Sequence, residues 1–352
     1  MISRIDRYVA QQVLGAMFIV ATGVVGLDLV FRIIDQLPDL TESYTFIDLV
    51  IVVLLTFPQR LYENMPLWVL IGCLVGLGGL ASSSELTVMR AAGMSPGRIA
   101  AAVIKPVAGL IVVMVLVGEY MVPSTQQMSI AHRAEALQHN TGALSRGVWH
   151  REGDTFIHID VVYPSGRLGG LTRYEFEGHT LQRVSEAKYA LFNDNEWVLS
   201  QVVATQISET QTSVERHDEE VWQVEMTPGL LKTLAAKPEN LSIQGLYFYS
   251  QYLASQGIAA SDYEVAFWTK VLQPVAMIGL VIVGVSFIFG PLRGVTLGQR
   301  LMTGVGVGLV FSLLQDLTAP VTSVFGIPPL VAVMTPILLT LLFGAWLMRR
   351  AD

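Results

Sequence analysis

Four basic residues lie near the ends of apolar stretches, on the side that the charge pattern described below places away from the cytoplasm. They are Arg32, Arg60, Arg133 and Lys270. A guanidinium can bind a phosphate through two parallel hydrogen bonds. We therefore predict that these cations bind the phosphates of a lipid in the outer leaflet. The alternative for Arg32 is an ion pair within its own helix, because Asp28 and Asp35 stand four residues before it and three after it.

A second candidate site is the charged stretch "SSSELTVMRAAGMS", which separates two apolar runs. Ser82 followed by Glu85 predicts a capping box, and Gly93 predicts the C-terminal end of a helix over residues 83–93. Leu86 and Met89 fall on the face that has Glu85 at its edge, with Arg90 nearby.

Two interpretations of this helix stay open from its residues alone. Its apolar stripe could lie on lipid headgroups, or it could fill a groove on another protein. The chain has no G-x-x-x-x-G-K-[ST] sequence and so does not hydrolyse ATP by itself. That absence favours docking of a separate ATPase.

The sequence offers little support for an enzyme. It has no H-E-x-x-H and no G-x-S-x-G, and its six histidines are scattered, so we predict no metal and no cofactor bound by this chain. Asp28 and Asp316 could suggest an aspartyl protease within the membrane, but both fall at the outer ends of their helices.

Glycines recur at the spacing typical of close helix packing. Gly304 and Gly308 form G-x-x-x-G with Gly306 between them, and Gly72 and Gly76 form another. Gly304, Gly306 and Gly308 could serve tight packing within one subunit, or a mobile interface with a partner's helices that acts as a lateral gate. The sequence does not separate these alternatives.

The elements that position these residues cross a membrane. Of 352 residues, 52% are hydrophobic and 14% are charged, which indicates an integral membrane protein. Apolar stretches predict six spans, at residues 10–34, 62–81, 99–122, 266–290, 300–320 and 327–348. We expect residues 46–57 to form an amphiphilic or tilted segment on the outer side.

Between the third and fourth spans the sequence period changes from helical to two. Alternating segments such as "TFIHIDVVY" and "EWVLSQVVATQI" are separated by "PSGRLGG", "NDN" and "ERHDEE", which predicts an all-β sandwich, jelly roll or open barrel. The domains are then spans 1–122, a β domain at 123–263 and spans 264–352. The β domain carries the whole net charge of −7, which argues against a nucleic acid partner.

Basic residues near the spans set the orientation. If the six crossings alternate, most of them fall on one side: Arg4, Arg7, Arg90, Arg98, Lys105, Arg293, Arg300, Arg349 and Arg350. Both termini are then predicted to be cytoplasmic, and the β domain is predicted to lie outside, which is the periplasm if the source is a Gram-negative bacterium.

Several segments, in the right order over the whole length, resemble the family of lipopolysaccharide export permeases (LptF/LptG). They are "IDRYVAQQVL", "RIIDQL", "SELTVMRAAGMS", "GEYMVPSTQQMSIAHRAEA", "LSIQGLYFYSQYLASQG", "FWTKVLQPVAM" and "SFIFGPLR". "FGPLR" and "LSIQGL" are similar to the G-type rather than the F-type subunit.

The resemblance implies an ABC transporter in the inner membrane: a heterodimer of F-type and G-type permeases with two cytoplasmic ATPase subunits that use ATP and Mg²⁺. It implies a jelly roll joined to a membrane-anchored bridge protein and a periplasmic bridge, and a cavity that extracts lipopolysaccharide from the outer leaflet. By residue, Arg32 and Arg133 match basic positions near the lipid's phosphorylated sugars, and Glu85 matches the carboxylate of the coupling helix. Pro38 and Asp39 depart from the pattern, since some relatives carry lysines there.

The mechanism we expect is that closure of the ATPase dimer moves the helix of Glu85, which rocks the glycine-rich spans and narrows the lipid cavity. The acyl chains would then move up into the jelly roll. The alternative is a subunit that couples an ATPase to periplasmic partners without moving lipid through itself. An intramembrane enzyme is a third class, and no motif supports it.

Overall fold

A computed structural model of the chain describes residues 4–137, 148–162, 167–178, 180–193, 196–208, 211–222, 237–255, 260–290 and 295–351. Within these ranges, six helical runs are long and apolar enough to cross a membrane. They are Arg4–Asp39, Met65–Ser82, Pro96–Ile130, Ser261–Phe289, Gly298–Phe325 and Pro329–Arg350. The six predicted spans are therefore confirmed, although several helices extend further than their apolar cores.

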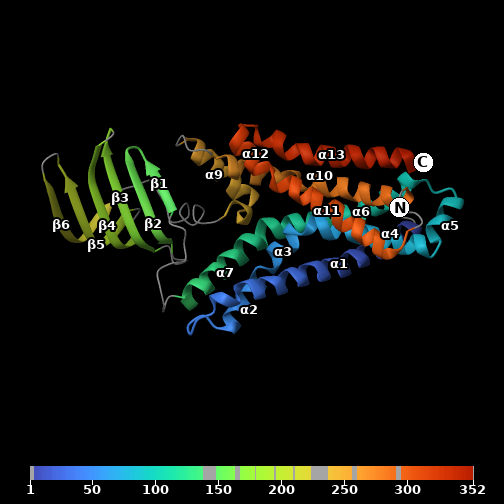
Figure 1. The fold of residues 1–352 in the computed structure, drawn as a ribbon, viewed down its shortest axis with the longest axis horizontal. Helices are drawn as coiled ribbons and strands as arrows, with labels where there is room; N and C mark the ends of the chain where they lie inside the picture. Colours follow the sequence, from blue (N-terminus) through green and yellow to red (C-terminus); the bar gives the residue numbers. More distant parts are fainter. Residues whose placement is uncertain are drawn as a thin grey trace. The chain divides into compact units, whose positions relative to one another are not determined.

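The helices follow the order drawn in Figure 1. The first half contains α1 (Arg4–Gln36), α2 (Phe46–Leu55), α3 (Phe57–Glu63), α4 (Met65–Ser82), α5 (Glu85–Ala91), α6 (Pro96–Leu116) and α7 (Val122–Leu137). The second half contains α9 (Ile243–Ser255), α10 (Ser261–Phe289), α11 (Leu297–Asp316), α12 (Thr318–Phe325) and α13 (Pro329–Ala351). Short 3₁₀ turns lie at Leu37–Asp39 and Pro238–Asn240.

The helical run that starts with α6 does not stop where its apolar sequence ends. A π-helical turn, Val117–Met121, joins α6 directly to α7, so the chain stays helical to Leu137. A π turn inside an α-helix is rare and is often found at functional sites. The first residues of the segment that we predicted to be all-β are therefore helical.

The described residues divide into two compact units. One consists of Met1–Asp35, Val53–Thr125 and Ser242–Asp352, and the other of Gln36–Val52 and Gln126–Leu241. The first unit holds most of the length of the spanning helices. The second holds the β-sheet together with the connection that follows α1.

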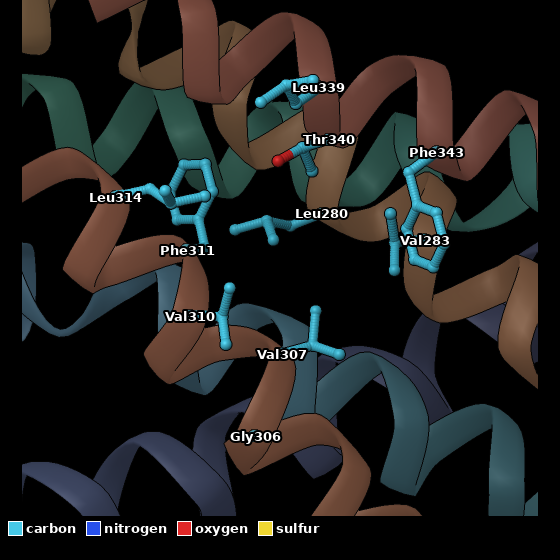
Figure 2. A pocket seen from close by; sticks show the side chains of 10 residues that line it. All are labelled: Leu280, Val283, Gly306, Val307, Val310, Phe311, Leu314, Leu339, Thr340 and Phe343. Carbon is cyan, nitrogen blue, oxygen red and sulfur yellow. The ribbon is translucent and has the colours of Figure 1, made fainter.

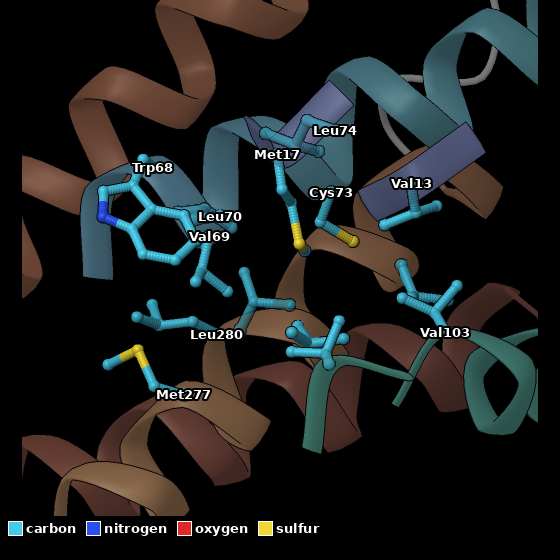
Figure 3. Close-up of a cluster of buried hydrophobic side chains, with 14 of the residues drawn as sticks. Val13, Met17, Trp68, Val69, Leu70, Cys73, Leu74, Val103, Met277 and Leu280 are labelled. Atoms are coloured by element: carbon cyan, nitrogen blue, oxygen red, sulfur yellow. The ribbon is translucent and has the colours of Figure 1, made fainter. Parts of the chain in front are cut away.

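The core of the first unit lies around α4, thirteen of whose eighteen residues are buried. Figure 3 shows this cluster, in which Met17 of α1, Leu70 and Leu74 of α4, Val103 of α6 and Met277 of α10 lie close together. Because α4 is apolar on every side, it can pack against neighbours in all directions. It is the central helix of this unit.

The β domain predicted in the middle of the chain is confirmed. Its described strands form one six-stranded antiparallel sheet in sequence order: β1 (Val148–Glu152), β2 (Thr155–Val162), β3 (Leu168–Glu177), β4 (Thr180–Asn193), β5 (Glu196–Ile207) and β6 (Thr212–Trp222). The sheet buries apolar side chains that include Ile157, Leu171 and Trp197. Consecutive pairing is the order of a meander, and the jelly-roll arrangement stays a prediction.

Two details of the β prediction need correction. The segment "ERHDEE", which we interpreted as a turn, lies inside β6, where Glu215 pairs with Ala204 and Glu220 with Leu199. Most of β6 is exposed, and a charged strand of this kind is typical of a protected sheet edge. The other error is β1, whose apolar pattern was too short to stand out. A further alternating segment, "VWQVEM" at 221–226, also predicts a strand, and its residues 223–226 lie outside the described residues.

Candidate functional site

The short helix α5 exists, but it begins differently from our prediction. Ser82 is the last residue of α4, and its hydroxyl donates to the carbonyl of Gly79 at 2.8 Å, so it cannot cap α5. The Ser83 hydroxyl donates instead to the Glu85 carboxylate at 2.9 Å. Ser84 then turns the chain with a φ of 63°. That left-handed conformation costs a residue with a side chain about 1 kcal/mol or more. The capping box prediction was wrong.

The predicted end of α5 at Gly93 is confirmed. Gly93 has a φ of 88°, and its amide donates to the carbonyl of Arg90 at 2.9 Å. The amide of Met94 donates to the carbonyl of Met89 at 3.1 Å. These two bonds form a Schellman motif, which requires a left-handed residue and therefore favours glycine.

The side chains of α5 point in directions that change the expected docking face. Leu86 is 4% exposed and Met89 packs against the same buried cluster, so both anchor the helix to its own chain. Val88 is 67% exposed and Glu85 is half-buried, so both remain accessible to a partner. Sequence reasoning missed Val88 because the helix was expected to present the stripe that it in fact buries.

Arg90 connects α5 to another spanning helix. Its guanidinium carbon lies 5.8 Å from the ring centroid of Phe289, the last residue of α10. A cation over an aromatic face is held electrostatically, by about 0.5–2 kcal/mol depending on exposure. Through Leu86 and Arg90, the helix α5 is therefore attached to the buried core and to one end of α10.

Arg300, which we had used only to orient the chain, is buried. Its Nη1 donates to the carbonyl of Gly78 at 2.6 Å, and a Cβ on Gly78 would lie 2.9 Å from the same nitrogen. Burying a guanidinium is costly unless it is hydrogen-bonded. This bond therefore fixes the start of α11 against α4.

Two of the predicted phosphate-binding cations share one carboxylate. Asp28 Oδ2 lies 3.6 Å from Arg32 Nε and 3.9 Å from Arg60 Nε. Arg60 also lies 2.6 Å from Glu63 through Nη1 and is the less exposed of the two arginines. The intrahelical pair considered for Arg32 is therefore present, and it involves Asp28.

Lys270, in the N-terminal half of α10, lies in a buried junction of the first unit. It is 6% exposed, and its Nζ lies 5.8 Å from the ring centroid of Tyr62. The Tyr62 carbonyl accepts a bond from Gln273 at 3.4 Å. A Cβ on Gly118 would lie 2.6 Å from the Tyr62 ring, so only glycine fits there. This burial makes Lys270 a poor candidate for direct contact with a lipid.

Two of the segments that resemble the permease family meet at the same junction. Glu119, in the π turn, accepts hydrogen bonds from the amides of Ile243 at 2.7 Å and Gln244 at 3.3 Å. A carboxylate at a helix N-terminus satisfies free amides and interacts favourably with the helix dipole. "GEYMV" and "LSIQGL" are thus joined by one carboxylate.

Arg133 belongs to the second unit. It lies 2.7 Å from Asp39 and 5.8 Å from the ring centroid of Tyr44, which is fully buried. Asp39 is one of the positions that departs from the family pattern, and here it pairs with the very cation that the family resemblance assigns to lipid. Nearby, His132 lies 3.0 Å from Asp48, so α2 and α7 are linked. Most of the segment 46–57, which we expected to be amphiphilic or tilted, is thus a helix that is attached to α7 by an ion pair.

The glycines separate into two groups. A Cβ on Gly304 would lie 2.8 Å from Leu74, and one on Gly308 would lie 2.7 Å from Leu67, so these two glycines bring α11 close to α4 within the chain. A Cβ on Gly306 would meet nothing within 4 Å. Packing within one subunit is therefore the observed role of Gly304 and Gly308, and Gly306 faces the other way.

Among the residues that the structure describes, no group of three or more His, Cys, Asp or Glu side chains could hold a metal ion. Arg293, in the "FGPLR" segment, lies outside the described residues. The site thus consists of an anchored helix that has a half-buried carboxylate, Glu85, in its first turn, and of ion-paired arginines on other helices.

Comparisons with known proteins agree with this description. Residues 7–350 match the family model described as lipopolysaccharide export system permease LptF/LptG. A protein of Haemophilus influenzae named lipopolysaccharide export system permease protein LptG is 34% identical over 99% of both chains. A protein of the same name from Escherichia coli K12 is 33% identical over 98% of both chains. The chain therefore belongs to the lipopolysaccharide export system permease family LptF/LptG, as a multi-pass inner-membrane protein and a permease rather than an enzyme.

Proposed function

We propose that this chain is the G-type half of a permease that lifts lipopolysaccharide from the outer leaflet of the inner membrane and passes it to a periplasmic protein bridge. Its partners are an F-type sister permease, two cytoplasmic ATPase subunits and a membrane-anchored bridge protein. Relatives of 33–34% identity over nearly the whole chain support this assignment. Both termini lie in the cytoplasm and the β domain lies in the periplasm, because Arg and Lys concentrate beside the cytoplasmic span ends.

The observation that carries the proposal is the geometry of α5. A helix that transmits force from a partner must be attached to its own chain and must leave side chains accessible to that partner. Leu86 is buried, the guanidinium of Arg90 lies against the ring of Phe289, and Glu85 is half-buried in the first turn of α5. An ATPase that binds Glu85 would thus move α5 together with the end of α10.

Arg32 is the best candidate among the four cations for a lipid phosphate. Its only described carboxylate partner within 4 Å, Asp28, is at 3.6 Å, and its side chain is 30% exposed. Arg60 and Arg133 have closer carboxylates, and Lys270 is buried. A phosphate can bind a guanidinium through two parallel hydrogen bonds, whereas the contact with Asp28 is a single one at 3.6 Å, so a phosphate can compete for Arg32.

The test is Glu85→Ala in the assembled complex, with Thr87→Ala as the matched control because Thr87 is exposed on the same helix. A hydrogen bond to a charged group contributes about 1.5–3 kcal/mol. Its loss weakens ATPase binding roughly 10- to 150-fold. The ATPase should therefore co-purify poorly with Glu85→Ala and normally with Thr87→Ala. Equal recovery and equal ATP-driven lipid release in both variants would contradict the coupling role.

A further inference from the structure

Tyr8, in the first turns of α1, contacts the carboxylate of Glu85 and has no role in the function proposed above. Its hydroxyl donates a hydrogen bond to that carboxylate, and the side-chain amide of Gln12 donates in turn to the Tyr8 oxygen. The Ser83 hydroxyl donates to the same carboxylate at 2.9 Å. Glu85 is therefore held both by a neighbour in the chain and by a spanning helix.

The packing of α1 on α4 explains how Tyr8 reaches α5. A Cβ on Gly72 would lie 2.5 Å from Met17 Cα. A Cβ on Gly76 would lie 2.7 Å from Val13 Cα, so a step of four residues forward on α4 matches a step of four residues back on α1. The two helices are thus antiparallel and closely packed. Continuing in the same directions reaches Tyr8 on α1 and the last turn of α4, from which the chain turns into α5.

The two hydrogen bonds fix the Glu85 side chain before a partner arrives. Glutamate is among the side chains that lose most rotamer freedom when they are immobilised, and a hydrogen bond to an ionised carboxylate is stronger than one between neutral groups. Glu85 is half-buried, so a partner reaches one part of it while Tyr8 and Ser83 hold the rest. An ATPase that binds the oriented carboxylate then loses less free energy to ordering.

Arg90 attaches α5 to a second spanning helix, α10, through Phe289. Beyond that end α10 borders, with α11 and α13, the apolar pocket in Figure 2, and none of the ten residues that line this pocket is charged. The one basic residue within Ser261–Phe289 is Lys270, which is 6% exposed. Motion of α10 therefore displaces no accessible cation, and this route does not reach the candidate phosphate site.

The helix α1 differs because it carries Arg32, the best candidate for a lipid phosphate. It is helical without interruption from Arg4 to Gln36. Tyr8 and Arg32 are about 36 Å apart along its axis, at a rise of about 1.5 Å per residue. Rigid helices of this kind carry energetic coupling between distant sites. A displacement of Glu85 that moves Tyr8 is therefore transmitted to the position of Arg32.

We propose that Tyr8 is a positioning residue, which orients the Glu85 carboxylate for the ATPase and joins α1 to α5. This inference rests on the coupling role proposed above for Glu85 and adds a second route to the one through Arg90. The ATPase then moves α1, with Arg32 near its other end, together with α5. Tyr8 touches neither ATP nor lipid and acts only through Glu85.

The experiment is a double-mutant cycle. The permease pair in lipid nanodiscs, with this chain at full length, is titrated with the purified ATPase. Tyr8→Phe removes one hydroxyl and keeps the ring, so it should weaken ATPase binding roughly 2- to 10-fold, the net contribution of one hydrogen bond. In a Glu85→Ala chain it should cause no further loss. Tyr120→Phe, at a tyrosine that is 68% exposed on the π turn, is the matched control and should bind as the wild type does.

Lipid release tests the connection to α1. At ATPase concentrations that saturate each variant, Tyr8→Phe should hydrolyse ATP at the wild-type rate. It should release less than about half as much lipopolysaccharide per ATP, because α1 no longer follows α5. Release per ATP equal to that of the wild type would contradict the connection.

The outcomes distinguish this inference from the proposed function on which it depends. Wild-type binding by Glu85→Ala would overturn the proposed function and the inference with it. Weak binding by Glu85→Ala together with wild-type binding by Tyr8→Phe would overturn the inference alone. So would an equal loss from Tyr8→Phe in the wild-type and Glu85→Ala backgrounds, because a tyrosine that only stabilises the fold acts whether or not Glu85 is present.

Discussion

Replacing Gly76 with alanine should loosen the contact between α1 and α4. A Cβ at this position would lie 2.7 Å from Val13 Cα and 3.2 Å from the carbonyl oxygen of Gln12. Ordinary contacts begin near 3.4 Å, so the two backbones must separate by 0.7 Å (3.4 minus 2.7). No side-chain rotation can relieve this, because both atoms belong to the main chain.

The magnitude follows from two opposing effects. Alanine favours a helix over glycine by about 1 kcal/mol, whereas overpacking of a well-packed core costs about 1–3 kcal/mol. Gly79→Ala, on the same helix, gains the first effect without the second, since a Cβ there meets nothing within 4 Å. Gly76→Ala should therefore be less stable than Gly79→Ala by about 1–3 kcal/mol.

The chain supplies its own probe for this comparison. Cys73 is its single cysteine and is fully buried on α4. A dye that becomes fluorescent on reaction with thiols reports the temperature at which Cys73 becomes accessible. Measured at one heating rate, because unfolding of such proteins is often irreversible, Gly76→Ala should melt below Gly79→Ala. If it melts at the same temperature or above, the close packing of α1 on α4 is wrong.

Three further predictions concern the other sites. Arg32→Glu should reduce crosslinking of lipopolysaccharide to the outer end of α1 severalfold, whereas Arg32→Lys should retain most of it; wild-type crosslinking in Arg32→Glu would exclude the phosphate role. Arg90→Met removes the cation over Phe289 but keeps the packing. ATP hydrolysis should therefore continue, while the amount of lipid released per ATP falls. An unchanged amount of lipid per ATP would show that α10 does not receive the motion of α5 through this contact. Burial lowers the pKa of His150, so the unfolded β domain binds more protons and stability should fall as the pH drops below about 6.5. Hydrogen exchange of β1 at pH 7.5 and 5.5, corrected for intrinsic rates, checks this, and His150→Gln should remove the difference.

Much of the architecture could be predicted from the sequence, because membrane spans and antiparallel strands have strong periodic signals. The six spans, the inserted β domain and the end of α5 at Gly93 are confirmed. Each depends on local sequence. Apolar length determines a span, alternation determines a strand, and a left-handed position favours glycine.

The errors arose where tertiary contacts outweigh local patterns. Ser82 looked like a helix cap, but α4 extends through it and uses its hydroxyl. Leu86 looked like part of a docking stripe, but it packs into the core of its own chain. The apolar periodicity of a helix shows which face is buried but does not identify the protein that buries it.

The charged residues of the candidate lipid site illustrate the same limit of prediction from the sequence. The positions of Arg32, Arg60 and Arg133 could be deduced from orientation and resemblance, and so could the pair of Arg32 with Asp28 in its own helix, but the partner of Arg133 could not. Asp39 lies 94 residues from Arg133 in the chain, and no pattern in the sequence indicates that they meet. Lys270 was expected at a lipid surface, and it is instead buried beside Tyr62.

The most direct test of the account is ATP-driven release of lipopolysaccharide from proteoliposomes that contain the complete complex. We predict release by the wild-type complex and by Thr87→Ala, and little release by Glu85→Ala even at ATPase concentrations that restore binding. Wild-type release rates with Glu85→Ala would contradict the claim that this chain receives the force of the ATPase through α5.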